Sequence, residues 1–213
     1  MEFTDFFNKA LKVTKMELPG EAFHLKMAPI ERLLELTKIA KDKNTARRAA
    51  VLALFYPSEE GATKLILILR KTYKGVHSNQ VGFPGGKYEE EDSNYEETAL
   101  RETEEEVGVP RETVTVLKEL TEIYIPPSNF FVQPFFAVTK TTPQFVAQEE
   151  EVEALIEVDL EHFMDDSIII TKTLSTSYAT DIEVPAYLIN GHVVWGATAM
   201  MLSEIREILK ELL

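Results

Sequence analysis

Apolar residues recur along the chain with two different periods, and these periods predict where helices and strands lie. Near the start they repeat at intervals of three and four residues, at Phe3, Phe6, Phe7, Ala10 and Leu11. This spacing predicts a helix that ends near residues 19–20, where proline and glycine follow. Similar spacing predicts a second helix over roughly residues 29–40 and a C-terminal helix over residues 196–213.

Short apolar runs separated by polar turns predict a series of strands. They cover residues 49–56, 64–69, 113–117, 121–125, 130–138, 168–171, 184–189 and 192–195. The first two runs flank a short turn and are expected to form a hairpin, while residues 149–160 are expected to be a loop leading into a strand. Pro134 cannot donate to a ladder and predicts an edge or a bulge for its strand. Without a regular βαβ alternation, the pattern indicates an α+β fold or a helix–sheet–helix sandwich.

Composition places the chain among globular proteins. Its 213 residues, of which 45% are apolar and 27% charged, suffice for one large domain or for a domain with an extension. No apolar run reaches the length of a transmembrane helix, and the first residues lack the pattern of a secretory signal. The absence of cysteine excludes disulfides, thiol nucleophiles and cysteine-ligated zinc, and is compatible with a cytoplasmic protein.

The net charge of −14 narrows the classes of partner. Such a surface repels phosphate backbones, so binding to nucleic acid or to an anionic membrane is not expected. A small anionic substrate is compatible with this charge if metal ions and a local basic patch reverse the field. Since His, Asp and Glu are the strong metal ligands available, Mg²⁺ or Mn²⁺ is the natural choice of ion.

Residues 84–109, PGGKYEEEDSNYEETALRETEEEVGV, carry an unusual density of carboxylates. Ser93 followed by Glu96 predicts a capping box at the start of a helix, and Gly108 followed by Pro110 predicts its end. Within that helix, three residues share one face and would pack on a sheet. These are Leu100, Thr103 and Val107.

Three glutamates, Glu102, Glu105 and Glu106, share a different face of the same helix. Like charges at this spacing destabilise an isolated helix by a few tenths of a kcal/mol per pair, so a compensating cation is a reasonable inference. The alternative is an ordinary acidic helix that faces water. The surroundings favour a cation, because Gly85 and Gly86 allow close backbone approach and Arg101 can pin carboxylates.

This pattern resembles the Nudix box, the loop–helix–loop signature of the Nudix hydrolases. The matching positions are Gly86, Arg101, Glu102, Glu105, Glu106 and Gly108. The chain has one extra residue between the first glycine and the arginine, Asp92 where the family has glutamate, and Thr103 where it has an apolar residue. The resemblance implies an α/β/α sandwich with a mixed central sheet and the catalytic loop–helix–loop.

The residues before the box are similar to the coenzyme A diphosphatase subgroup. Within residues 65–87, Arg70 and the run from Phe83 to Lys87 match, whereas Gly75 and Asn79 differ. Further similarities cover residues 121–135, 149–152 and 195–202. The resemblance spans about residues 49–213, which implies a hydrolase domain at 46–213 and an N-terminal helical extension at 1–45.

The resemblance also implies a reaction, the attack of water on a pyrophosphate phosphorus with Mg²⁺ or Mn²⁺ as cofactor. Metal ions neutralise the diphosphate and make water more acidic, which this chemistry requires. Glu102, Glu105 and Glu106 are the expected metal ligands, together with a backbone carbonyl near Gly86. The general base is a box glutamate or Glu151 of a later loop, whose alternative is a solvated acidic run.

Substrate contacts are expected from a small basic cluster and from two loop residues. The candidates are Arg70, His77, Phe83, Lys87, Ser128 and Asn129. Basic residues can hold the outer phosphates of coenzyme A, although lysines on a loop are often only solubilising. Ser128 and Asn129 are alternatively turn formers.

The sequence thus predicts a cytoplasmic Nudix pyrophosphohydrolase that acts on coenzyme A or acyl-CoA. The products would be adenosine 3′,5′-bisphosphate and 4′-phosphopantetheine. One alternative is cleavage of ADP-ribose or another nucleoside diphosphate derivative. Another is a catalytically silent nucleotide-binding module, against which the complete glutamate set argues. The extension at residues 1–45 would cap the domain or build a homodimer.

Overall fold

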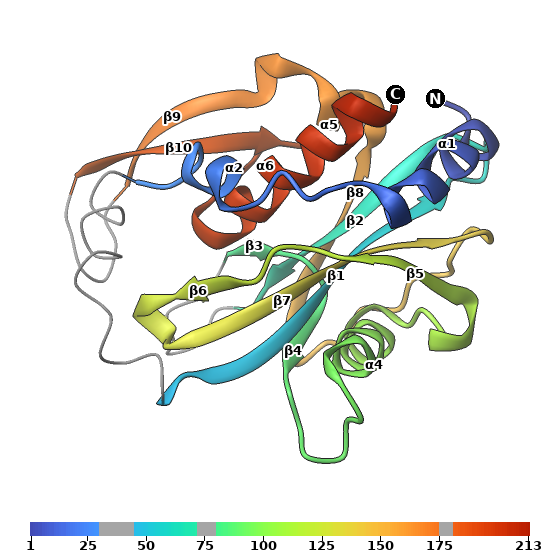
Figure 1. Ribbon diagram of the computed structural model, residues 1–213, viewed down its shortest axis with the longest axis horizontal. Coiled ribbons are helices and arrows are strands. Elements are labelled where there is room, and N and C mark those ends of the chain that lie inside the picture. The colour runs from blue at the N-terminus through green and yellow to red at the C-terminus, as the bar shows by residue number, and fades with distance from the viewer. Residues whose placement is uncertain (30–44, 72–79, 175–180) are drawn as a thin grey trace.

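The computed structural model describes residues 1–29, 45–71, 80–174 and 181–213. The helix predicted over residues 29–40 therefore lies almost wholly outside the described residues. The described part is built on one large and one small β-sheet with helices around them (Figure 1). In the same ranges, no helix is both long enough and apolar enough to cross a membrane.

The large sheet has eight strands in the described residues and is mixed. Its path runs β3-β2-β1-β7-β5, with β4 paired to β1, β6 to β7 and β8 to β2. Among the described strands of this sheet, only the pairing of β1 with β7 is parallel. The strands are β1 (Arg47–Pro57), β2 (Thr63–Arg70), β3 (Val81–Gly82), β4 (Gly85–Lys87), β5 (Val114–Glu119), β6 (Ile123–Ile125), β7 (Phe130–Thr139) and β8 (Val152–Asp159).

The hairpin predicted for the first two strands is confirmed. β1 and β2 are antiparallel, with Phe55 opposite Leu65 and Pro57 opposite Thr63. Beyond this short ladder the two strands separate, and β1 continues beside β4 and β7. β1 therefore runs through the centre of the sheet and connects the hairpin to the glycine-rich strand β4.

Alternate residues of β1 face two separate cores, as the period of two requires. Ala53 and Phe55 face the first core, which contains residues of α1 (Phe3–Ala10) and α6 (Gly196–Leu212). Leu52 and Leu54 face the second, which contains Ala99 and other residues of α4 (Tyr95–Val107). Helices thus cover both faces of the large sheet (Figure 1). The predicted mixed α+β sandwich is confirmed.

The N-terminal residues pack into the first core. Phe6 is fully buried in α1, and its ring lies 5.1 Å from that of Phe55. α1 continues as the 3₁₀ helix η1 (Leu11–Lys15), so the predicted first helix ends slightly before the proline and glycine. The sequence pattern did not predict α2 (Glu21–Leu25), a short helix that packs on α6.

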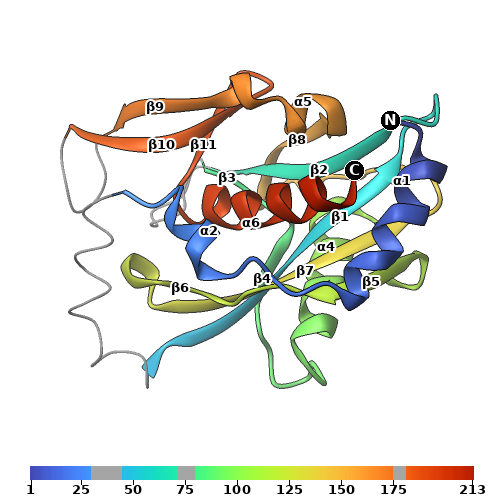
Figure 2. The same ribbon diagram turned by 45° about the horizontal axis from the view of Figure 1, so that its top comes forward.

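The small sheet lies across α6 from the large one, so that α6 is between two sheets (Figure 2). It has the order β11-β10-β9, with bounds Ile169–Leu174 for β9, Ile182–Ile189 for β10 and His192–Trp195 for β11. The remaining short helices are η3 (Arg111–Thr113), η4 (Pro126–Ser128), α5 (Leu160–Met164) and η5 (Asp166–Ile168).

The edge position predicted from Pro134 is wrong, because β7 lies between β1 and the pair β5 and β6. Along β7, residues 130–132 pair with β6 and residues 135–139 pair with β5. Pro134 lies in the gap between these two antiparallel ladders. Its carbonyl accepts from Leu120 N at 2.9 Å, so its missing N–H falls on the same side. The Gln133 side chain donates to the Leu120 carbonyl at 2.7 Å and supplies the hydrogen bond that proline cannot.

Candidate functional site

The acidic helix α4 begins one residue later than the capping box predicted. Asn94 is the N-cap, and its side chain accepts from Glu97 N at 2.9 Å. Glu97 in turn accepts at 2.8 Å from the N of Ser93, the residue before the N-cap, so the cap uses Asn94 and Glu97 in place of Ser93 and Glu96. At the other end Gly108 is left-handed with φ 73°, as the predicted stop requires.

Asp92 and Arg101 join the loop before α4 to the helix itself. Arg101 donates from Nε to Asp92 Oδ1 at 2.8 Å and from Nη2 to Oδ2 at 2.9 Å. Thr98 Oγ1 donates to the same buried carboxylate at 2.8 Å. The hydrogen bond from Arg101 holds the pKa of Asp92 well below its ordinary value. Asp92 therefore stays ionised and fixes the loop at the point where the family box has a glutamate.

The two glycines of β4 allow the strand to pass directly against β1 and α4. Gly85 has φ +146°, and a side chain there would overlap the β1 backbone at Ala50 and Val51. A side chain at Gly86 would overlap the carboxylate of Glu102. The backbone contact requires glycine at position 85, while the absent side chain at Gly86 lets the Glu102 carboxylate lie against the backbone of β4.

Glu106 is the most buried carboxylate of the predicted set, with 1% of its side chain exposed. Its Oε2 accepts from Gly85 N at 2.8 Å. Arg70 Nη1 lies 3.2 Å from Oε1, but no described residue gives Oε1 a hydrogen bond of acceptable geometry. Burial raises the pKa of Glu106 to about 7, against the opposing effects of Arg70 and Gly85 N. This carboxylate is thus desolvated and incompletely partnered.

Glu102 and Glu105 lie beside Arg101 on the outer side of the same helix. Arg101 Nη1 is 3.0 Å from Glu102 Oε1 and 3.3 Å from Glu105 Oε2. Glu102 is mostly buried and Glu105 is half exposed. Burial raises the pKa of Glu102 above its ordinary value, and the nearby charges of Glu105 and Glu151 add to this. The three box glutamates therefore form a graded series from the interior to solvent.

Arg70 and Glu151 complete the group from the end of β2 and the loop before β8. Arg70 Nη2 lies 3.6 Å from Glu151 Oε2, and Arg70 Nη1 donates to the Gly85 carbonyl at 3.4 Å. The sequence placed Arg70 among substrate contacts and did not predict its pairing with Glu106. The signal that could have found it is the single arginine at the end of an otherwise apolar strand.

The fit of a divalent cation can be tested on these donors. Within the described residues, no three His, Asp or Glu side chains already stand together in a metal-binding arrangement. The donors nevertheless suit a hard cation, because Glu106 Oε1 is buried without a hydrogen bond and Glu102 lies against Gly86. In the structure, the guanidinium groups of Arg70 and Arg101 neutralise the carboxylates.

The other predicted substrate residues are dispersed. Phe83 is buried in the core on the α6 side of the sheet, whereas Lys87 is exposed at the end of β4. Ser128 closes η4, and Asn129 is left-handed with φ 52° and accepts from Tyr124 Oη at 2.9 Å. Both therefore form a turn, the alternative reading of the sequence. His77 lies outside the described residues.

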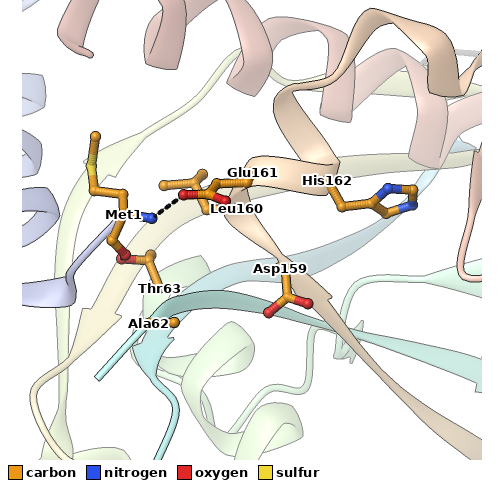
Figure 3. Close-up of a pocket in the computed structure, with 7 residues that line it drawn as sticks. All are labelled: Met1, Ala62, Thr63, Asp159, Leu160, Glu161 and His162. Atoms are coloured by element: carbon orange, nitrogen blue, oxygen red, sulfur yellow. Dashed lines mark hydrogen bonds and ion pairs between the residues drawn. The ribbon is translucent and has the colours of Figure 1, made fainter. Parts of the chain in front are cut away.

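A pocket of about 310 Å³ lies away from the acidic helix (Figure 3). Its lining comes from the first residue, the start of β2 and the end of β8 with α5: Met1, Ala62, Thr63, Asp159, Leu160, Glu161 and His162. Glu161 reaches across it to the Met1 nitrogen at 2.7 Å (Figure 3). None of these seven residues belongs to the predicted site, so this pocket is separate from it.

Comparisons with known proteins agree with the box geometry. A NUDIX domain model matches residues 46–172. Nudix hydrolase 15, mitochondrial, of Arabidopsis thaliana is 34% identical over 127 residues, which are 59% of this chain and 44% of that protein. The chain therefore spans less than half the length of the plant relative. The uncharacterized Nudix hydrolase NudL of Yersinia pestis is 31% identical over 172 residues, covering 76% of this chain and 80% of that one.

Solved structures agree with the fold. The Nudix hydrolase RenU of M. smegmatis superposes with a TM-score of 0.54 at 17% identity, over 79% of this chain and 88% of that chain. A MutT/nudix family protein of Enterococcus faecalis gives a TM-score of 0.51 at 18% identity, over 89% of this chain and 73% of that chain. At these identities the likeness concerns the fold alone.

Proposed function

Since this chain belongs to the Nudix hydrolase family, we propose that it cleaves the pyrophosphate bond of coenzyme A or acyl-CoA with Mg²⁺ or Mn²⁺. The products would be adenosine 3′,5′-bisphosphate and 4′-phosphopantetheine, or its acyl form. The observation that carries the metal-dependent chemistry is Glu106, a buried carboxylate with one oxygen that lacks a hydrogen bond in the described structure. A group in this state stays in a fold most readily when it serves chemistry.

Four groups are proposed to hold the metal ions: the carboxylates of Glu102, Glu105 and Glu106 and the backbone carbonyl of Gly86. Bound Mg²⁺ or Mn²⁺ would neutralise the diphosphate and acidify water. Glu106 contributes from the buried side, and Glu105 from the exposed side, where a side chain can move to meet an incoming substrate. Arg101 orients Glu102 and Glu105, and Asp92 holds Arg101.

The proton of the attacking water requires a base. Glu151 is our candidate, because its carboxylate is half exposed and faces the buried end of the glutamate series. Glu105 or Glu106 is the alternative, which applies if the enzyme uses its box carboxylates for both ligation and proton transfer.

The choice of coenzyme A rests on the sequence from Arg70 to Lys87, which is similar to the coenzyme A diphosphatase subgroup. Lys87 is exposed beside the loop that carries Gly86 and is free to meet an outer phosphate. We propose Lys87 and His77 as the substrate-recognition region, whereas Arg70 pairs with Glu106 and Glu151, Phe83 lies in the core, and Ser128 and Asn129 form a turn. ADP-ribose is the competing substrate, and a silent nucleotide-binding module is the competing class.

A substrate panel tests these alternatives. The protein is incubated with Mg²⁺ or Mn²⁺ and coenzyme A, acetyl-CoA, ADP-ribose, NADH or diadenosine polyphosphates, and the products are separated by chromatography. Coenzyme A cleaved with the highest kcat/KM supports the proposal. ADP-ribose as the best substrate replaces the coenzyme A assignment, and no cleavage of any compound, with nucleotide binding retained, supports the silent module.

We further propose that the hydrolase domain comprises residues 46–213 and that residues 1–45 form an N-terminal extension of it. The protein is proposed to act in the cytoplasm, possessing neither nucleic-acid nor membrane partners. The extension is proposed either to cap the domain or to build a homodimer, and light scattering of the full chain separates the two. A monomer at micromolar concentration would refute the dimer.

A further inference from the structure

Arg70 stands between two carboxylates that come from different parts of the chain. Its Nη1 lies 3.2 Å from Glu106 Oε1 of α4, and its Nη2 lies 3.6 Å from Glu151 Oε2 of the loop before β8. The guanidinium is about three-quarters buried, because 24% of the Arg70 side chain is exposed. A planar fork with separate donors suits this arrangement, whereas a lysine would offer a single point of charge.

A β-bulge lies directly at Arg70 and sets this geometry. Leu69 is opposite Ala154 in β8, but the next residue, Arg70, is opposite Val152, so that Glu153 is the extra residue. Bulges re-aim side chains at the ends of strands. Ile66 and Ile68 face the α4 core, and by the period of two Arg70 points to that same face. The bulge then brings the start of β8 beside the guanidinium.

The backbone of the Glu151 loop is anchored without help from Arg70. Val146 N donates to the Val107 carbonyl at 3.0 Å, and Gln148 N donates to the Glu106 carbonyl at 3.0 Å. Lys71 N donates to the Glu151 carbonyl at 2.8 Å. In the described part of the chain, the carboxylate of Glu151 has its ion pair with Arg70 and is 52% exposed. The main chain is therefore fixed, while the direction of the carboxylate depends on Arg70.

We propose that Arg70 is a positioning residue that turns the carboxylate of Glu151 toward Glu106, and that it affects catalysis through Glu151 and not by binding substrate. This inference rests on the proposed pyrophosphatase function. Glu151 and Glu106 are near enough for their charges to repel, and the guanidinium between them offsets that repulsion. An ion pair this exposed adds little to stability, so its effect is on the orientation of the base.

A double-mutant cycle on kcat tests the proposal. Arg70→Gln should lower kcat about tenfold, as expected for a misdirected catalytic group, and change KM by less than about twofold. Glu151→Gln should lower kcat about a hundredfold. The double variant should match Glu151→Gln, because Arg70 has nothing left to position. The proposal would be overturned if the kcat losses of the two single variants multiply in the double variant. A raised KM with unchanged kcat in Arg70→Gln would also overturn it.

Arg111→Gln is the matched control, because Arg111 also pairs with a glutamate of α4, Glu104, at 2.7 Å. It should keep full activity, and a loss equal to that of Arg70→Gln would refute a specific role.

A readout independent of turnover separates this proposal from the proposed function. The guanidinium NMR signals of Arg70 should shift in Glu151→Gln. They should keep their wild-type chemical shifts in Glu104→Gln. If no diphosphate is cleaved but this shift occurs, the contact stands and the pyrophosphatase assignment fails. If the Arg70 signals do not shift in Glu151→Gln, the positioning role is refuted.

Discussion

Two glutamates, Glu106 and Glu204, are almost completely buried on opposite sides of the large sheet, and they differ in the number of hydrogen-bond donors around them. Glu106 belongs to α4 and Glu204 to α6, with 1% and 0% of their side chains exposed. Glu204 accepts hydrogen bonds from four donors in two segments of the chain, α2 with its N-cap and the segment after β5. The donors are Gly20 N, His24 Nε2, Thr121 N and Thr121 Oγ1. Among the described residues, Glu106 has a hydrogen-bond donor on one oxygen only.

The two carboxyl groups respond to burial in opposite directions. Burial by itself would raise the pKa of Glu204, but the hydrogen bonds from His24 and Thr121 outweigh it and lower the pKa below its ordinary value. Burial prevails for Glu106, whose pKa is raised to about 7. A fully partnered buried carboxylate is a structural link, here between α2, α6 and the segment after β5. An incompletely partnered one keeps an oxygen available for a proton or a further ligand.

The largest expected effect is on turnover in Glu106→Gln. The isosteric amide keeps the shape but loses the negative charge proposed to hold a metal ion, so kcat/KM should fall about 10³-fold, or about 4 kcal/mol. Steady-state kinetics on the best substrate of the panel measure this fall. Glu104→Gln on the same helix serves as the control and should remain active. Full activity of Glu106→Gln would remove Glu106 from the metal site.

The next effect concerns stability against pH in protein treated with a chelator. The folded pKa of Glu106 is raised to about 7 from an ordinary 4.5, so the unfolded chain releases its proton first as pH rises. The stability contributed by Glu106 is complete below pH 4.5 and is lost by pH 7, a fall of roughly 3 kcal/mol. Urea unfolding between pH 4.5 and 8 should show this fall in wild type and not in Glu106→Gln. If the unfolding free energies of wild type and Glu106→Gln vary with pH in the same way, the raised pKa is contradicted.

Glu204→Gln should lower stability and leave activity nearly unchanged, the reverse of the effect on activity expected for Glu106→Gln. The amide loses the charge that strengthens the hydrogen bonds from His24 and Thr121, so the free energy of unfolding at pH 7 should fall by about 2 kcal/mol. Activity per folded molecule should stay within about twofold, because Glu204 is on the other side of the sheet. Since the pKa of Glu204 is lowered, its contribution is present above its ordinary pKa and is lost as pH falls through the folded value. Lost activity with unchanged stability would reverse the roles assigned to the two glutamates.

The smallest effect is expected from Thr121→Val. Thr121 Oγ1 donates to Glu204 Oε1 at 2.5 Å, and loss of this one donor should cost about 1 kcal/mol of unfolding free energy. Chemical denaturation measures the change. Thr115→Val, an exposed threonine of β5, is the control and should be neutral within error. A cost in Thr121→Val no larger than in this control would show that Glu204 does not depend on each of its donors.

Local patterns predicted most of the fold. The runs at residues 49–56 and 64–69 became β1 and β2, and the apolar spacing after Gly196 became α6. The place of Pro134 could not be predicted, because it depends on Gln133 and Leu120, which meet only after β7 has paired on both sides. The division of strands between two sheets likewise depends on α6 lying between them, a relation that no local pattern contains.

The site was predicted to the extent that one helix contains it. The spacing of Glu102, Glu105 and Glu106 follows from the helical period, and Gly108 ends the helix as expected. The cap moved from Ser93 to Asn94 because both residue types accept backbone hydrogen bonds, so tertiary context selects between neighbours. The contact between Arg70 and Glu106 joins β2 to α4 across the fold, and the pairing of Arg70 with Glu151 depends on the bulge at Glu153.

The parallel pairing of β1 with β7 has a consequence for the order of folding. Residues 47–55 pair with residues 130–138, and the whole acidic helix lies in the segment between them. Closing so long a segment costs chain entropy before any contact is gained, and such long-range pairing slows folding. The hairpin of β1 and β2 and the helix α4 are local and can form early. The arrangement of carboxylates beside Gly85 requires β4 to dock on β1, so the site is assembled by tertiary pairing and not by the helix α4 alone.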